Sequence, residues 1–170
     1  VENIKTGDTF QLEKTNGDAG CWSPDSQYLY YSNVVVGTAG YWNIVLRADI
    51  ASESFSTVLS GNVESEGFSV YNPVCNPKDK LVAVTIQPDP KTPGAELFLL
   101  NPDAKDGISI MNDLTKIPSF YSWTPDGNRI VYQLDALGGA ENTVEIWMWD
   151  RKTGASKKIS SGSNTPQWLP

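Results

Sequence analysis

The feature that most constrains the fold of this chain is a short motif that returns at a near-constant spacing. Its copies read CWSPD at residues 21–25, VCNPKD at 74–79, SWTPDG at 122–127 and QWLP at 167–170. The prolines of these four copies are 53, 48 and 45 residues apart. A self-similar period of this size is typical of repeat architectures, in which each copy is one supersecondary unit.

An apolar run follows each of the first three copies. These runs read YLYY at residues 28–31, LVAV at 81–84 and RIVY at 129–132. They are rich in β-branched and aromatic residues and are bounded by turn formers, which predicts strands. Because proline presets φ at the first position of a turn, each motif is expected to form a tight turn between two strands.

A second alignment supports the period. The segment ELFLLN at 96–101 matches EIWMWD at 145–150 with an offset of 49 residues, and NIVL at 43–46 takes the same place in the first copy. Each repeat is therefore expected to contain four short antiparallel strands, which we call a, b, c and d. The fourth strands are predicted at residues 55–59, 108–111 and 157–159.

Several of these strands are apolar on both sides, and IWMW at 146–149 has no polar side at all. A sheet that is apolar on both faces must be covered on both faces. Radial stacking of four-stranded sheets, as in a β-propeller, achieves this. A plain β-sandwich is the alternative, but it would not require turns repeated at a near-constant period. We predict an all-β fold with three complete four-stranded antiparallel β-propeller blades and partial blades at both ends.

The predicted organisation is one propeller segment over residues 1–170. The sequence KTG at 5–7 matches KTG at 152–154, which indicates a d strand left over from a preceding blade. The predicted divisions are 1–20 for that strand, 21–66 for blade 1, 67–115 for blade 2, 116–161 for blade 3 and 162–170 for the first strand of a following blade. Because propellers usually have at least four blades, we expect the chain to be part of a larger propeller, as a piece of a longer chain or by self-association.

The recurring W-[ST]-P-D-[GS] motif, with a c strand ending in Asp or Asn and a T-G turn before strand d, resembles the TolB-type (WD40-like, PD40) β-propeller repeat. The resemblance covers nearly the whole chain. The second copy departs most, with Cys75 for Trp, Asn76 for Ser and Lys78 for Asp. Such repeats occur in periplasmic scaffold proteins, propeller domains of serine oligopeptidases, oligogalacturonate lyases and cell-surface proteins, so the resemblance implies a fold and leaves the function open. The residues expected to be structural parts of the motif are Trp22, Pro24, Asp25, Pro77, Trp123, Pro125, Asp126, Gly127 and Trp168.

Loop placement gives the best indication of a binding surface. The a–b and c–d turns share one end of each blade and are uniform, whereas the b–c and d–a loops at the other end vary. Because binding residues usually lie on variable loops held by a rigid scaffold, we predict that this second end meets a protein partner. Residues 34–36 either extend strand b or form an exposed apolar contact, and the proline-rich segment 87–93 is expected to be stiff and extended. The candidate partner surface comprises Val34, Val35, Val36, Trp42, Pro88, Pro90 and Leu137.

Composition excludes several kinds of chemistry. The chain has no histidine, which rules out Ser-His-Asp and Cys-His catalysis and His-based zinc sites within it. Two cysteines cannot supply the four thiolates of an all-cysteine zinc site. A net charge of −7 argues against a nucleic-acid partner, and no apolar run approaches the roughly 18 residues of a membrane span. We therefore expect no catalytic residue, no cofactor and no metal.

The remaining candidates for chemistry have a structural interpretation. Asp25 and Asp126 hold equivalent repeat positions and are expected to accept hydrogen bonds from turn amides, although a pair of carboxylates converging on a sugar stays possible from sequence alone. Trp22, Trp123 and Trp168 are equivalent and are expected between blades, while Trp42 and Trp149 are expected in the core rather than in a sugar platform.

The two cysteines are expected to be buried free thiols. Cys75 sits where the motif has Trp22, and Cys21 lies one position earlier. Because side chains alternate along a strand, the two thiols are expected to point to different faces, which disfavours a disulfide.

The function predicted from the sequence is a non-catalytic protein-interaction or assembly scaffold. The alternatives are an accessory propeller of a larger enzyme of the serine oligopeptidase type and a carbohydrate-binding propeller. The family resemblance, the acidic composition and the start at Val1 rather than Met together predict an extracytoplasmic location, periplasmic or at the cell surface.

Overall fold

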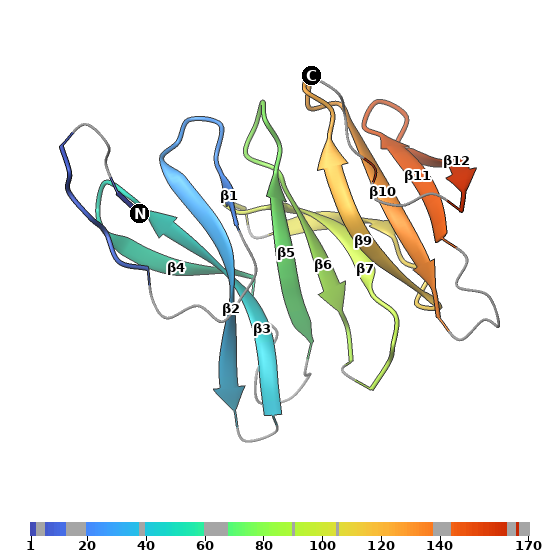
Figure 1. Cartoon of the computed structure of the whole chain (residues 1–170), viewed down its shortest axis with the longest axis horizontal. Coiled ribbons are helices and arrows are strands. Elements are labelled where there is room, and N and C mark those ends of the chain that lie inside the picture. Colours follow the sequence, from blue (N-terminus) through green and yellow to red (C-terminus); the bar gives the residue numbers. More distant parts are fainter. Residues whose placement is uncertain are drawn as a thin grey trace.

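The described residues form three four-stranded antiparallel sheets and contain no helix (Figure 1). The computed structural model describes residues 1–2, 6–12, 20–37, 40–59, 68–89, 91–104, 106–137, 144–162 and 166, without the side chains of residues 37, 40 and 42. This architecture confirms the predicted all-β fold with three four-stranded blades.

Each sheet takes its strands in sequence order, so each blade is an up-and-down meander. The strands are β1 (Cys21–Trp22), β2 (Tyr28–Gly37), β3 (Gly40–Asp49) and β4 (Ser54–Leu59) in blade 1; β5 (Ser69–Cys75), β6 (Val82–Gln87), β7 (Glu96–Asn101) and β8 (Asp106–Met111) in blade 2; and β9 (Lys116–Trp123), β10 (Arg129–Ala136), β11 (Val144–Asp150) and β12 (Ala155–Ser161) in blade 3.

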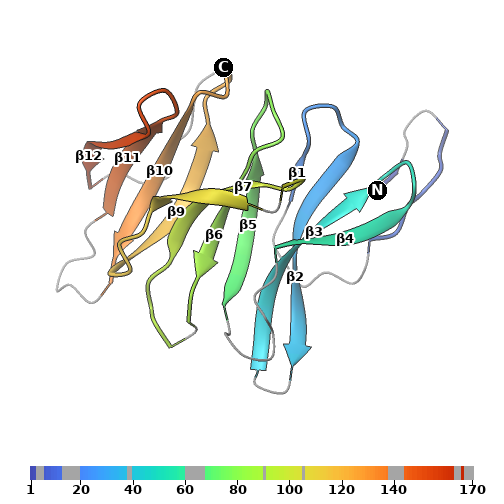
Figure 2. The same cartoon turned by 180° about the vertical axis from the view of Figure 1, so that it is seen from behind.

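The three sheets stand side by side, with blade 2 in the middle (Figures 1 and 2). The first strand of blade 2, β5, lies close to β1 of blade 1 and to β9 of blade 3. The fourth strands, β4, β8 and β12, form the opposite edges of the sheets and diverge. Neighbouring sheets therefore contact each other through the first strand of the following blade, β5 or β9, and are farther apart at their fourth strands, as propeller blades are.

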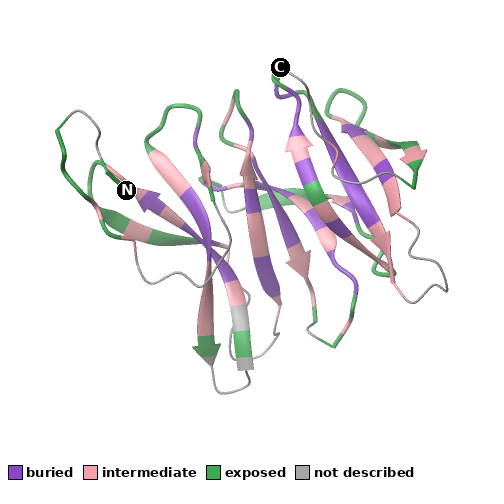
Figure 3. Ribbon diagram, viewed as in Figure 1, coloured by how far each residue is buried: buried purple, intermediate pink, exposed green. Residues whose placement is uncertain are grey.

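Strand β6 of blade 2 is buried on both faces, which explains its continuous apolar run (Figure 3). On one face, Val82 and Val84 pack with Tyr30 of blade 1. On the other face, Ala83 packs with Trp123 of blade 3. Successive side chains of a strand point to opposite faces, so a run without polar residues is required where both faces are covered.

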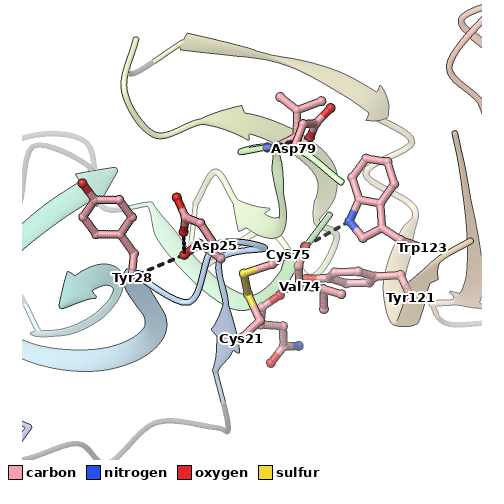
Figure 4. The surroundings of a disulfide bond; sticks show 11 residues. Cys21, Asp25, Tyr28, Val74, Cys75, Asp79, Tyr121 and Trp123 are labelled. Atoms are coloured by element: carbon pink, nitrogen blue, oxygen red, sulfur yellow. Dashed lines mark hydrogen bonds between the residues drawn. A yellow bond between two sulfur atoms is a disulfide. The ribbon is translucent and has the colours of Figure 1, made fainter. Parts of the chain in front are cut away.

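Polar side chains also connect blade 2 to blade 3. The indole Nε1 of Trp123 donates to the carbonyl of Val74 at 3.1 Å (Figure 4). The side-chain amide of Asn76, which is fully buried, donates to the carbonyl of Gly127 at 2.9 Å. The repeat motifs of the two blades are thus bonded directly to each other.

A local irregularity in β5 ties blade 2 to both neighbours. Asn72 has φ of 54° and lies within a register shift of the β5–β6 ladder. Its backbone amide donates to Ser32 Oγ of blade 1 at 3.1 Å, and its backbone carbonyl accepts a hydrogen bond from the hydroxyl of Tyr121 in blade 3. Phe120, at the equivalent repeat position of β9, has φ of 45° and also lies at a register shift. Bulges of this kind re-aim the backbone of a strand.

The prediction of two free thiols is wrong, because Cys21 and Cys75 form a disulfide that joins blade 1 to blade 2, with a Cα–Cα distance of 5.5 Å (Figure 4). Their neighbours on the adjacent strands, Tyr30 and Val82, belong to the cluster between these two blades. The prediction treated the two positions as parts of one sheet. In a stack of sheets, opposite faces of neighbouring sheets meet, so cysteines that are one position out of phase come together.

Two further expectations differ from the structure. Trp22 was expected between blades, yet it is 44% exposed, because its face of blade 1 has no further blade against it within the described chain. The segment 87–93 is not extended throughout, since the amide of Thr92 donates to the carbonyl of Asp89 at 2.9 Å and closes a turn.

A matched pair of glycines tests the bond between the repeat motifs. Gly127 and Gly154 both have left-handed backbones, with φ of 71° and 66°. A Cβ on Gly154 would meet nothing within 4 Å, whereas one on Gly127 would lie 2.4 Å from Oδ1 of Asn76. We expect Gly154→Ala to lower the free energy of unfolding by about 1 kcal/mol and Gly127→Ala by about 2–4 kcal/mol, measured by urea denaturation. Equal losses would contradict the close approach of Asn76.

Reduction of the disulfide is expected to destabilise the chain. The bond closes a loop with a sequence separation of 54 residues, for which the chain-entropy model gives about 4 kcal/mol. Urea denaturation with and without reductant measures this difference. The Cys21→Ser/Cys75→Ser double variant is the control, and its stability should not respond to reductant. An unchanged midpoint for the parent chain on reduction would refute the cross-link.

Candidate functional site

The repeat carboxylates at the a–b end of the blades are occupied by their own turns. Oδ1 of Asp25 accepts a hydrogen bond from Ser23 Oγ at 2.6 Å (Figure 4). It also accepts one from the amide of Gln27 at 3.1 Å. Oδ1 of Asp126 accepts equivalent bonds from Thr124 Oγ1 at 2.5 Å and the amide of Asn128 at 3.1 Å.

These bonds lower the pKa of both carboxyl groups. The hydrogen bond from Ser23 is the main cause at Asp25, and the one from Thr124 lowers the pKa of Asp126 to about 2. Both groups are therefore ionised at neutral pH and cannot serve as general acids, which need a pKa near the working pH. In both blades the carboxylate stabilises its own a–b turn.

The c strands of blades 1 and 3 end in carboxylates with the same role, whereas that of blade 2 ends in Asn101. Oδ1 of Asp49 accepts from the amides of Ala51 and Ser52, at 3.0 and 3.1 Å. Oδ1 of Asp150 accepts in the same way from the amides of residues 152 and 153, at 3.0 and 3.2 Å. The Asp at the end of strand c is thus explained by the c–d turn that it holds.

The opposite, b–c end of the molecule carries an exposed apolar tip. The hairpin of β2 and β3 runs in continuous register for ten pairs and reaches beyond the b–c loops of the other blades (Figure 1). Near its end Val36 pairs with Tyr41, and these side chains are 70% and 74% exposed. Of the two interpretations of residues 34–36, strand b does run on, and Val36 alone of the three is exposed.

The other two valines are partly shielded. Val34 is half-buried, and Val35 packs against the cluster that contains Tyr31 and Ile44 of the same blade. The exposed residue that the sequence interpretation missed is Tyr41. Alternation along β3 assigns Tyr41 to one face of the strand. The hairpin register then places it opposite Val36.

Of the remaining candidate residues, the structure describes the side chains of Pro88 and Leu137. Pro88 is half-buried, and Leu137 is half-buried with its amide donating to the carbonyl of Thr115 at 3.1 Å. The backbone of Trp42 lies in β3, opposite Val35, but its side chain is outside the described part of the structure, as are Pro90 and Trp168 entirely.

The motif prolines and the remaining tryptophans are placed as follows. Pro24, Pro77 and Pro125 are all exposed at the a–b turns. Trp149 is buried in the cluster between blades 2 and 3, in contrast to a surface platform. Phe120 in β9 is a second exposed aromatic side chain that no sequence motif predicted.

A charged cluster lies where β11 begins, at the b–c end of blade 3. Glu145 is paired with Lys158 at 2.5 Å and with Lys116 at 3.1 Å, and its Oε2 accepts from Trp147 Nε1 at 3.0 Å. Lys158 is the main cause that lowers the pKa of Glu145 to about 2, with Trp147 second. A carboxylate with three partners is suited to holding strands together and not to proton transfer near neutral pH.

The described residues offer no group of three or more His, Cys, Asp or Glu side chains that could hold a metal ion. Both cysteines are consumed by the disulfide, which leaves no thiol nucleophile. The described part of the chain also contains no helix long and apolar enough to cross a membrane.

The Glu145 cluster predicts an acid-sensitive stability. The pKa of Glu145 is lower in the folded chain than its ordinary value of 4.5. Its contribution to stability is therefore complete above about pH 4.5 and is lost as the pH falls toward about 2. We expect Glu145→Gln, which keeps the acceptor for Trp147, to make the free energy of unfolding less dependent on pH in this window. Urea denaturation at a series of pH values measures the slope, and an unchanged slope would show that the cluster does not couple to folding.

Comparison with known proteins supports the same fold. No family model and no curated protein sequence matches the chain. Among solved structures, an oligogalacturonate lyase in complex with manganese is similar with a TM-score of 0.63 and 16% identity, over 85% of this chain and 41% of that one. TolB from Acinetobacter baumannii is similar with a TM-score of 0.55 and 16% identity, over 84% of this chain and 31% of that one.

The β-propeller domain of the Trilobed protease from Pyrococcus furiosus, described as having an open velcro topology, is similar with a TM-score of 0.58 and 10% identity. The match covers 88% of this chain and 44% of that domain. The chain thus spans less than half the length of each of these structures. At these identities the likeness concerns the fold alone, and it agrees with the repeat motif and the three stacked sheets: this chain consists of β-propeller blades of the type that TolB also has.

Proposed function

We propose that this chain is a non-catalytic protein-interaction scaffold and that the tip of the β2–β3 hairpin is its main contact. The observation that carries this proposal is the exposed cross-strand pair of Val36 and Tyr41 near the end of the β2–β3 hairpin. Tyrosine combines a large apolar ring with a polar tip and is enriched at protein interfaces. The two strands pair in continuous register, which holds the two side chains next to each other before binding and so reduces the conformational entropy lost on association.

Two properties of the chain support a role without catalysis. The sequence has no histidine, and the repeat carboxylates accept hydrogen bonds from their own turns. The disulfide between blades 1 and 2 supports an extracytoplasmic location, because such bonds persist in oxidising compartments.

Site-specific cross-linking tests the proposal. Benzoylphenylalanine at position 41 should capture a partner in an extract of the native cells, whereas the same group at exposed Ser52, in the c–d turn of blade 1, should not. With the captured partner purified, Val36→Glu and Tyr41→Glu should each weaken binding about tenfold or more by calorimetry, and Ser52→Glu should leave it unchanged. Capture from position 52 alone, or equal binding by all variants, would reject the hairpin as the contact.

A carbohydrate-binding propeller is the second candidate, because Phe120 exposes an aromatic ring on the first strand of blade 3. Aromatic faces are suited to stacking against other flat or apolar surfaces. Binding on a glycan array that disappears in Phe120→Ala would favour this function over the scaffold. An accessory propeller of a larger enzyme is the third candidate, and a native chain with an intact mass near 18.6 kDa would exclude it.

A further inference from the structure

The wedge between the splayed outer parts of blades 2 and 3 contains an open groove. It has a volume of about 390 Å³, and its apolar lining comes from Leu81, Leu99, Ile108 and Trp149. Asp106 and Arg151 also line it. We call this feature the rim groove. It lies at the a–b and c–d end of the blades, away from the hairpin tip of Val36 and Tyr41.

The corresponding wedge between blades 1 and 2 is filled by the protein itself. The repeat register places Tyr28 and Arg47 of blade 1 at the positions of Leu81 and Leu99 in blade 2. The guanidinium of Arg47 lies 4.8 Å from the centre of the Tyr28 ring and pairs with Asp103 of blade 2 at 2.9 Å. In the rim groove two leucines replace this cation–aromatic pair, so the same architectural gap stays open.

The edge strand beside the groove contains no lysine. Ile108 in β8 is 55% exposed, and the repeat register places Ser56 in β4 and Lys157 in β12 at its position. Edge strands are commonly guarded by charged residues, lysine above all, because their unpaired backbone groups can accept another strand. β12 has such lysines, and β8 has none.

The free part of this edge is short. Ser156 Oγ of β12 donates to the carbonyl of Ile110 at 3.4 Å, which engages the far half of β8. Pairing with another strand is therefore confined to residues 106–109. A residue placed opposite Ile108 would project on the same face of the sheet, toward the groove.

The charges beside the groove favour a ligand with a cationic side chain. Arg151 is already paired with Asp79. Asp106, in contrast, is exposed and has no ion-pair partner among the described residues. A cationic side chain of a ligand could pair with this carboxylate, and the net charge of −7 of the whole chain acts in the same direction.

We propose that the rim groove binds an extended peptide segment of a partner protein. The peptide backbone adds to the free edge of β8, one apolar side chain enters the groove against Leu99 and Trp149, and a flanking Lys or Arg pairs with Asp106. This mode combines main-chain pairing with a pocket for an alternate side chain, as in other cases of strand addition. The site is separate from the hairpin tip and does not depend on the function proposed above.

Titration of the isotope-labelled full chain with three capped pentapeptides, followed by amide NMR, tests the proposal. The probes are acetyl-Lys-Thr-Leu-Thr-Lys-amide, its analogue with Ser in place of Leu, and its analogue with Glu in place of both Lys. We expect the first peptide to shift the amide signals of residues 106–109 and 151–154 and the indole signal of Trp149. The Ser analogue should bind about tenfold more weakly, since burying one leucine contributes about 1.5–3 kcal/mol. The Glu analogue should also bind about tenfold more weakly, because it places a like charge beside Asp106.

A pair of exposed isoleucines supplies the matched variants. Ile108→Lys should weaken binding of the first peptide about tenfold. Ile159→Lys should not, because Ile159 is 53% exposed in β12 but does not line the groove. Circular dichroism and the melting temperature verify that both variants are folded. Absence of saturable shifts at millimolar peptide, shifts confined to other residues, or equal losses in the two variants would overturn the proposal. Val36→Glu should bind the peptide like the parent chain, which separates this test from that of the hairpin.

Discussion

The requirement that both faces of each sheet be covered is the constraint on which the rest of this structure depends. A strand such as β6, with valines directed at blade 1 and alanine directed at blade 3, cannot face water on either side without exposing apolar surface. Stacking the sheets removes that surface from water on both faces at once. The splay of the outer strands, the exposure of Trp22 and the position of the disulfide all follow from this geometry.

Blade 2 departs most from the repeat motif, and its departures are the residues that bind its neighbours. Cys75 replaces the motif tryptophan and is bonded to blade 1, while Asn76 replaces the motif Ser or Thr and donates to the carbonyl of Gly127 in blade 3. Asn72, at the bulge of β5, adds one hydrogen bond to each side. A degenerate copy of a repeat can therefore be the one most adapted to its place between others, since its substitutions add contacts between blades; Asn76, for example, still accepts a hydrogen bond from the amide of Lys78 within its own turn.

The sequence predicts the sheets well because the repeat and the period-2 alternation report directly on burial. Ile130 and Trp149 could be assigned to a covered face without knowledge of the neighbours. Contacts between sheets were harder to predict, because alternation within one strand does not say which face of the next sheet a given side chain meets. For that reason the prediction that Cys21 and Cys75 are free thiols was wrong.

The candidate site shows the same limit. Tyr41 was overlooked because its exposure depends on how far the β2–β3 ladder extends, and that register comes from the hairpin and not from composition. The rim groove has no motif either. It appears only when Leu81 and Leu99 are compared with the residues that fill the equivalent wedge between blades 1 and 2, and such a comparison needs the positions of whole blades. Gaps between elements are properties of packing, which a linear pattern does not record.

The central claim is that opposite faces of neighbouring sheets meet, and a non-reducing tryptic peptide map of the native chain tests it most directly. Trypsin should release residues 15–47 and 48–78 as separate peptides, each with one cysteine. If blades 1 and 2 stack as described, these peptides are recovered as one disulfide-linked species that separates on reduction. Recovery of both peptides with free thiols, in a chain kept from reductant throughout, would contradict the stacking.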